Sequence, residues 1–158
     1  MFDLESLLGE VETILKADLN TKIAAINSEK NDNIDMETIS NDAYFLQSLS
    51  EKSINYDPFI LYGVSQFEND DPGNFGFTST KVLIEIVLVK ADEGQDLQII
   101  KKMLRFQRAL REVIEDNFDS ISHKVKMQVQ SQVPIDLNLL NSSHSHKAIG
   151  ITIKCDLG

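Results

Sequence analysis

The sequence has 158 residues, of which 42% are hydrophobic and 25% charged, which matches the size and composition of one globular domain. Its apolar runs stop at four residues, which excludes a membrane-spanning helix, and residues 1–5 do not begin a secretory signal. The single cysteine excludes an intrachain disulfide, and a net charge of −10 disfavours binding to nucleic acid phosphates. We therefore expect an intracellular protein of one domain, residues 1–158.

An amphipathic helix is predicted over residues 4–28. Apolar residues recur there at spacings of three and four and form one stripe, which comprises Leu4, Leu8, Val11, Leu15, Leu19, Ile23 and Ile26. Residues 27–57 are mostly polar. Their apolar group from Ile39 to Leu49 is compatible with a short helix or with irregular packing, and Pro58 disfavours helix at Asp57.

Two strands separated by a long loop are predicted next. Phe59–Val64 forms the first strand, and the loop 66–80 contains the turn-forming residues Pro72 and Gly73. Residues 81–90 form the strongest strand, because apolar residues occupy both of its faces. Burial on both faces indicates a central position in the sheet.

A second long helix and two further strands complete the predicted fold. The helix spans 96–116, with a buried stripe of Ile100, Met103, Phe106, Leu110, Val113 and Ile114. Alternation over 125–133 predicts a half-exposed strand that ends at Pro134, and alternation over 149–155 predicts the last strand. We expect an α/β (α+β) fold in the order α-β-β-α-β-β, with two long helices packed on a mostly antiparallel sheet of about four strands.

No residue pattern in the sequence indicates a catalytic or metal site. The G-x-S-x-G, G-x-G-x-x-G and Walker A motifs are missing, and His144 and His146 have only His123 or a distant carboxylate as a third metal ligand. We interpret the two histidines as solvated side chains in a polar loop. We interpret Cys155 as a small core residue, and we predict no cofactor.

A basic ridge follows the second helix at spacings of four, three and three, and it contains all three arginines of the chain: Lys101, Arg105, Arg108 and Arg111. Two interpretations stay open, a solvated helix face or an interface with an acidic surface. Residues 1–80 carry 15 acids and 4 bases, whereas residues 81–158 carry 10 acids and 11 bases. The acidic half of a neighbouring copy is therefore a candidate partner, through acids such as Asp3, Glu5, Glu10 and Glu12.

The whole pattern resembles the tail terminator, or tail completion, proteins of tailed bacteriophages and related contractile particles. The resemblance lies in the size, the order of elements and four segments: the helix Leu4–Ile26, the strand start Tyr56-Asp57-Pro58-Phe59, the strand Lys81–Lys90, and residues 103–110. The last segment, Met-Leu-Arg-Phe-Gln-Arg-Ala-Leu, is similar to an Arg-aromatic-x-x-Ala-Leu pattern that is common in that group.

The resemblance implies a structural virion protein and not an enzyme. Proteins of this group form a ring, usually of six copies, on the head-proximal end of the tail tube, where they stop tube polymerisation and meet the neck. The implied partners are further copies of the chain, the tail tube protein and a neck or head-closure protein, with the tail sheath protein as a further candidate. Assembly would take place in the host cytoplasm. DNA crosses such a ring during ejection, and an acidic lumen would not retain it.

Two alternatives to a tail terminator stay open. The first is another neck component, such as a head-closure or tail-to-head joining protein. The second is a small enzyme whose site combines scattered residues, among them His123, His144 and His146.

Three phenylalanines, Phe67, Phe75 and Phe77, lie within the loop 66–80, which is otherwise rich in Asn, Asp and Gly. Aromatic side chains are typical anchors at protein interfaces. We predict that these three dock onto another subunit or a tube protein. The alternative is that they fold back onto their own sheet.

Overall fold

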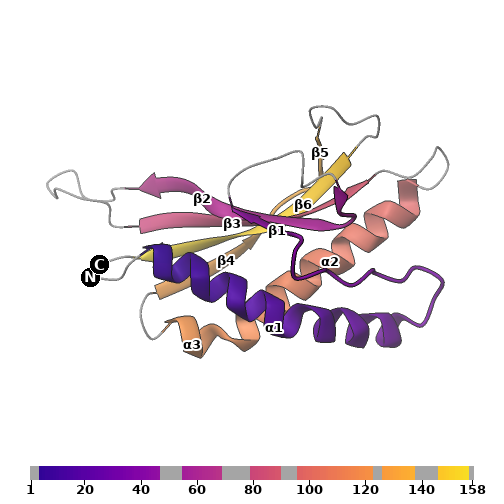
Figure 1. The fold of residues 1–158 in the computed structure, drawn as a ribbon, viewed down its shortest axis with the longest axis horizontal. Helices are drawn as coiled ribbons and strands as arrows, with labels where there is room; N and C mark the ends of the chain where they lie inside the picture. The colour runs from indigo at the N-terminus through magenta and orange to yellow at the C-terminus, as the bar shows by residue number, and fades with distance from the viewer. Residues whose placement is uncertain are drawn as a thin grey trace, which may run out of the picture.

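The computed structural model shows a six-stranded sheet with its helices on one face (Figure 1). It describes residues 4–46, 55–68, 79–89, 96–122, 126–137 and 146–156. The elements in chain order are α1 (Leu4–Lys30), β1 (Tyr44–Leu46), β2 (Phe59–Glu68), β3 (Ser79–Val89), α2 (Asp96–Asp116), α3 (Phe118–Ser122), β4 (Lys126–Ser131), β5 (Ile135–Leu137) and β6 (His146–Asp156). The strand order is β1-β2-β3-β6-β4, and β5 also pairs with β6.

The predicted α+β class and the mostly antiparallel sheet are confirmed, but the predicted strand count and order are wrong. Every strand pair is antiparallel except β1 with β2, which is parallel. The additional strands, β1 and β5, have three residues each, and the additional helix α3 has five. Elements this short are below the length at which a hydrophobic period becomes visible in a sequence.

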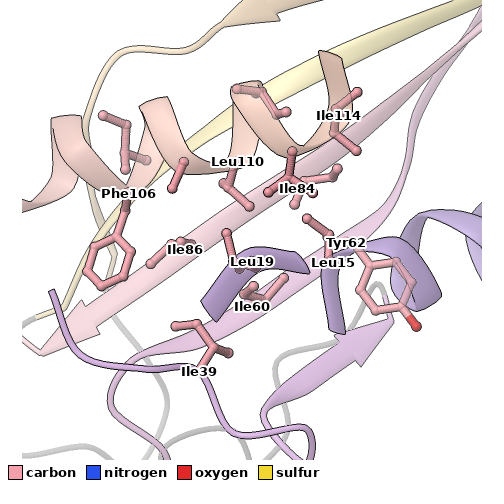
Figure 2. Packing of buried hydrophobic residues seen from close by; sticks show 14 of the residues in the cluster. Leu15, Leu19, Ile39, Ile60, Tyr62, Ile84, Ile86, Phe106, Leu110 and Ile114 are labelled. Atoms are coloured by element: carbon pink, nitrogen blue, oxygen red, sulfur yellow. The ribbon is translucent and has the colours of Figure 1, made fainter. Parts of the chain in front are cut away.

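The central strand of the sheet is β3, as the apolar residues on both of its faces predicted. It pairs with β2 on one side and with β6 on the other, and Ile84 lies opposite Tyr62 and Ile151. Ile84 and Ile86 are fully buried beneath the helices, where they meet side chains from α1 and α2 (Figure 2). The core therefore lies between the two long helices and the middle of the sheet.

Both predicted long helices are present. The first extends two residues beyond the predicted 4–28, and the second matches 96–116. On α1, Leu15 and Leu19 are fully buried, whereas Leu4 and Leu8 are only partly buried and Leu7 takes the core position instead. The predicted stripe of α2 is buried, apart from Ile100, which is only partly buried and packs against the edge of the core.

A return segment, residues 31–43, leads the chain from the end of α1 back along that helix to β1. The segment packs irregularly, which was one of the two alternatives that its composition allowed, and Tyr44–Leu46 directly after it form β1. Two asparagines of α1 hold its backbone. The Asn27 side chain donates to the Met36 carbonyl (3.0 Å) and accepts from the Met36 N–H (2.9 Å), and Asn20 does the same for Ile39 (2.9 and 2.7 Å).

The β4 and β5 strands form one interrupted edge along β6. The interruption spans Gln132 to Pro134, where the Gln132 N–H still reaches the carbonyl of Gly150 (2.9 Å). Val133, which alternation placed with the apolar face of the predicted strand 125–133, is instead 75% exposed. The ladder breaks at this point because Pro134 has no N–H to donate to it.

Two glycines provide a matched test of this packing. A Cβ at Gly150 would lie 2.2 Å from the Ile84 carbonyl oxygen and 2.9 Å from Glu85 Cγ, so Gly150→Ala should lower the free energy of unfolding by about 1–3 kcal/mol. Gly9→Ala meets no atom within 4 Å and should raise it by up to about 1 kcal/mol, because alanine favours helix. Urea titration of both variants measures the difference, and an unaffected Gly150→Ala variant would contradict the register of β3 with β6.

Candidate functional site

The basic ridge of α2 is held against acids of the same chain. Arg105 is only 9% exposed, and its guanidinium forms a bidentate pair with Asp32, with Nη1–Oδ1 at 2.8 Å and Nη2–Oδ2 at 2.5 Å. Nη1 also donates to the carbonyl oxygen of Ile34 (2.6 Å). This one side chain therefore fixes the start of the return segment to α2.

The neighbouring cations of α2 behave similarly. Lys102 pairs with Glu37 of the return segment (2.6 Å). Arg108 pairs with Glu29 near the end of α1 and with Glu112 on its own helix. Arg111 pairs with Glu115 (2.8 Å) and donates to Ser131 Oγ (3.1 Å), which connects α2 to the β4 edge. Lys101, in contrast, has an exposed side chain on the outer face of α2.

These pairs change the interpretation of the ridge. Lys102, Arg105 and Arg108 pair with Glu37, Asp32 and Glu29 of the same copy of the chain, and not with the acids that were considered in a neighbouring copy. Glu12, which was considered as a partner in a neighbouring copy, pairs with Lys16 of its own helix, and Asp3 lies outside the described residues. An additional contact between subunits through the ridge stays a prediction.

The ion pair between Asp32 and Arg105 depends on pH through only one of its two partners. The hydrogen bonds from the Arg105 guanidinium and from the Ile34 N–H hold the pKa of Asp32 far below its ordinary value. The same pairing raises the pKa of Arg105, which stays charged at any pH that the fold survives. Only protonation of Asp32 can therefore break this contact by titration.

A second polar group joins α1 to the sheet. The Tyr62 hydroxyl donates to Glu12 Oε2 (2.5 Å), Lys16 Nζ lies 2.6 Å from Glu12 Oε1, and the same ammonium lies 5.4 Å from the centre of the Tyr44 ring. Burial raises the pKa of Tyr62, and the hydrogen bond to Glu12 raises it further. Burial alone would raise the pKa of Glu12, but the hydrogen bonds from Lys16 and Tyr62 outweigh this effect and lower the pKa overall. Tyr62 therefore stays neutral and Glu12 stays charged. The contacts of Glu12 with Tyr62 and of Lys16 with Tyr44 hold α1 over β2 and β1.

The structure tests the predictions for one histidine, His146, and for Cys155. The prediction that His146 is solvated is wrong. It is the first residue of β6, pairs in register with Val89 and is 1% exposed. Cys155 is fully buried on β6, as predicted. His123 and His144 lie outside the described residues. Within the described ranges, no group of three or more His, Cys, Asp or Glu side chains is placed to hold a metal ion.

The predicted aromatic anchors lie at or outside the end of the described β2–β3 hairpin. Phe75 and Phe77 lie outside the described residues, and Phe67 is described only through its backbone, which pairs with Thr80 in the β2–β3 hairpin. Their docking role stays a prediction. The predicted bounds of the loop, 66–80, are wrong, because β2 continues to Glu68 and β3 begins at Ser79. The two strands pair as antiparallel neighbours through these residues.

The sheet order separates the two halves of the sequence in space. The acidic half supplies α1, β1 and β2, and the other half supplies β3, β6, β4, β5 and α2 (Figure 1). Residues 1–80 carry a net charge of −11 and residues 81–158 a net charge of +1. Among the described residues, the half that supplies α1, β1 and β2 therefore has an excess of carboxylates, and three of these, Glu29, Asp32 and Glu37, pair with cations of α2.

Sequence reasoning found the unusual set of cations on α2 but missed the acids that complete it. Glu29 and Asp32 lie in a polar stretch that sequence patterns identified only as turn-forming. The density of carboxylates between residues 29 and 37 was the available signal, since the chain must bring them near cations if that stretch returns along the helices.

Comparison of the chain with models of protein families and with curated proteins found no match. Of the helices in the described ranges, none combines the length and the apolar character needed to cross a bilayer.

Replacing Arg105 should destabilise the fold of a single chain. Arg105→Gln removes the bidentate pair and the bond to the Ile34 carbonyl, and we expect the free energy of unfolding to fall by about 1–3 kcal/mol. Arg111→Gln is the matched control, because that side chain is 46% exposed and should contribute less than about 1 kcal/mol. Equal losses in the two variants, measured by urea titration, would show that the Asp32 contact does not hold the return segment.

The contact with Asp32 should also appear in the pH dependence of stability. Because the folded-state pKa of Asp32 is depressed, its stabilisation is complete above the ordinary carboxyl pKa and decreases as the pH falls below it. Between about pH 5 and pH 3, the wild type should therefore lose more stability than Asp32→Asn, which has no carboxyl to protonate. Thermal unfolding at a series of pH values tests this, and parallel curves for the two proteins would contradict it.

Proposed function

We propose that the chain is a structural subunit of the tail terminator type, which forms a ring on the head-proximal end of a phage tail tube. The observation that supports this best is the lateral separation of charge, with the acidic α1, β1 and β2 on one side and the nearly neutral β6, β4 and β5 on the other. The long helices, the start of β2 at Phe59 and the strand β3 also occupy the segments on which the resemblance rests.

Charge separation of this kind favours one type of self-association. A two-fold contact between identical acidic sides would bring two surfaces with an excess of carboxylates together, and like charges repel. A head-to-tail contact instead places the acidic side of one copy against the nearly neutral side of the next. Repetition of a single head-to-tail contact closes into a ring when its rotation divides a full turn.

The proposed ring accounts for the overall charge of the chain. Six copies would carry six times the net charge of −10 around a central passage. DNA that crosses such a passage is repelled by it and is not retained. In this proposal the tail tube protein binds one side of the ring, and a neck or head-closure protein binds the other.

Tube assembly in vitro tests the function directly. Tail tube subunits of the same particle, polymerised in the presence of the chain, should give tubes that carry a cap at one end and have a narrow length distribution in negative-stain images. The matched controls are tubes polymerised without the chain and tubes to which a ring-free, unfolded preparation is added. Uncapped tubes of unlimited length in the presence of the folded chain would contradict the proposal.

A further inference from the structure

Five large apolar side chains are exposed among the described residues, and four of them lie on the sheet edges or directly beside one. Their exposures are 51% for Leu46, 69% for Leu97, 49% for Leu104, 75% for Val133 and 44% for Ile135. Leu46 ends β1 at one edge of the sheet, whereas Val133 and Ile135 belong to the β4–β5 edge on the opposite side. An isolated subunit gains nothing from apolar side chains at open edges, which are sites of unwanted association.

Leu104 lies beside the β4–β5 edge because α2 is fastened to that edge. The Gln107 side-chain amide donates to the carbonyl oxygens of Gln132 (2.6 Å) and Gly150 (2.8 Å), and Arg111 one turn further reaches Ser131. Leu104 precedes Gln107 by one helical turn, and Val133 directly follows Gln132. We name Leu104, Val133 and Ile135 the α2–β5 corner.

The two edges also differ in charge. Among the described residues, Glu12, Asp42 and Asp57 are the acids near β1, and the ammonium of Lys16, which pairs with Glu12, lies over the Tyr44 ring. The α2–β5 corner is bordered by Lys101, Arg111 and Lys147, with Glu115 and Asp136 as the acids that pair with two of them. The acidic edge therefore complements the corner in charge, and each of them offers exposed apolar surface to the other.

The geometry points to a specific subunit contact: the α2–β5 corner of one copy docks on the β1 edge, around Leu46, of a second copy of the chain. This inference rests on the proposed ring, and it names the two surfaces that the ring would join. The two surfaces lie on opposite sides of one sheet, so the contact is head-to-tail and leaves a free edge for the next copy at each end.

Cysteine cross-linking separates this contact from its alternatives. The double variant Leu46→Cys with Val133→Cys should form covalent ladders of several subunits on mild oxidation, because each contact brings one cysteine of each kind together. Neither single variant should cross-link with itself. The native Cys155 is fully buried and does not take part. Rapid dimerisation of Val133→Cys alone would show a two-fold contact through the β4–β5 edge and would overturn the inference.

Charge substitutions at the same position give a second measurement. Val133→Asp should weaken self-association at least about tenfold in sedimentation, because it loses apolar burial and faces an acidic edge. Val133→Lys loses the same burial but gains attraction, so its loss should be smaller. Ala24→Asp, which adds the same charge on the exposed face of α1, should leave association unchanged. Thermal unfolding of all three variants verifies that they fold.

The outcomes distinguish the contact from the function. Normal oligomers in Val133→Asp, together with the absence of ladders, would overturn this contact while capped tail tubes would still support a terminator. A wild-type chain that stays monomeric at the highest concentration, alone and with tube subunits, would overturn both. Ladders without any capping of tubes would support the contact and contradict the proposed function.

Discussion

The return segment, residues 31–43, is the constraint on which the rest of the structure depends. It packs Met36 and Ile39 into the core without forming a strand or a helix there, so its backbone polar groups need partners from side chains. Asn20 and Asn27 provide them from α1, and Arg105 provides one from α2. Since the segment leads the chain to β1, these contacts hold its backbone against both helices just before the first strand of the sheet.

Lys102, Arg105, Arg108 and Arg111 of α2 therefore make their charged contacts within the chain, so the proposed ring would use other side chains. A buried guanidinium that already has a carboxylate and a carbonyl has little to offer a second copy, and removing it harms the subunit first. Exposed apolar side chains have no such internal use. The two roles differ with burial: Arg105 is 9% exposed and contacts its own chain, whereas Val133 is 75% exposed and would contact a second copy in the proposed ring.

The long elements were predictable from the sequence, because each carries its own hydrophobic period. The β3 strand was placed at the centre from its two apolar faces, and α2 was bounded to the residue. The β1 and β5 strands were not predictable, since three residues carry no period and their pairing depends on partners elsewhere in the chain. The partner of Arg105 was hidden for the same reason. Asp32 lies 73 residues away, and only the path of the return segment brings the two together.

The order of the strands explains how one short chain acquires two unlike sides. The β3 strand begins where the acidic half of the sequence ends, so the boundary between the two halves runs through the middle of the sheet, between β2 and β3. Ion pairs such as Arg108 with Glu29 and Lys22 with Asp116 join the halves where the helices meet. Other described acids of the N-terminal half, such as Glu5 and Asp42, are exposed on α1 and just before β1. In the proposed ring this same asymmetry would set the direction of the subunits, because the reverse orientation would bring two acidic sides together.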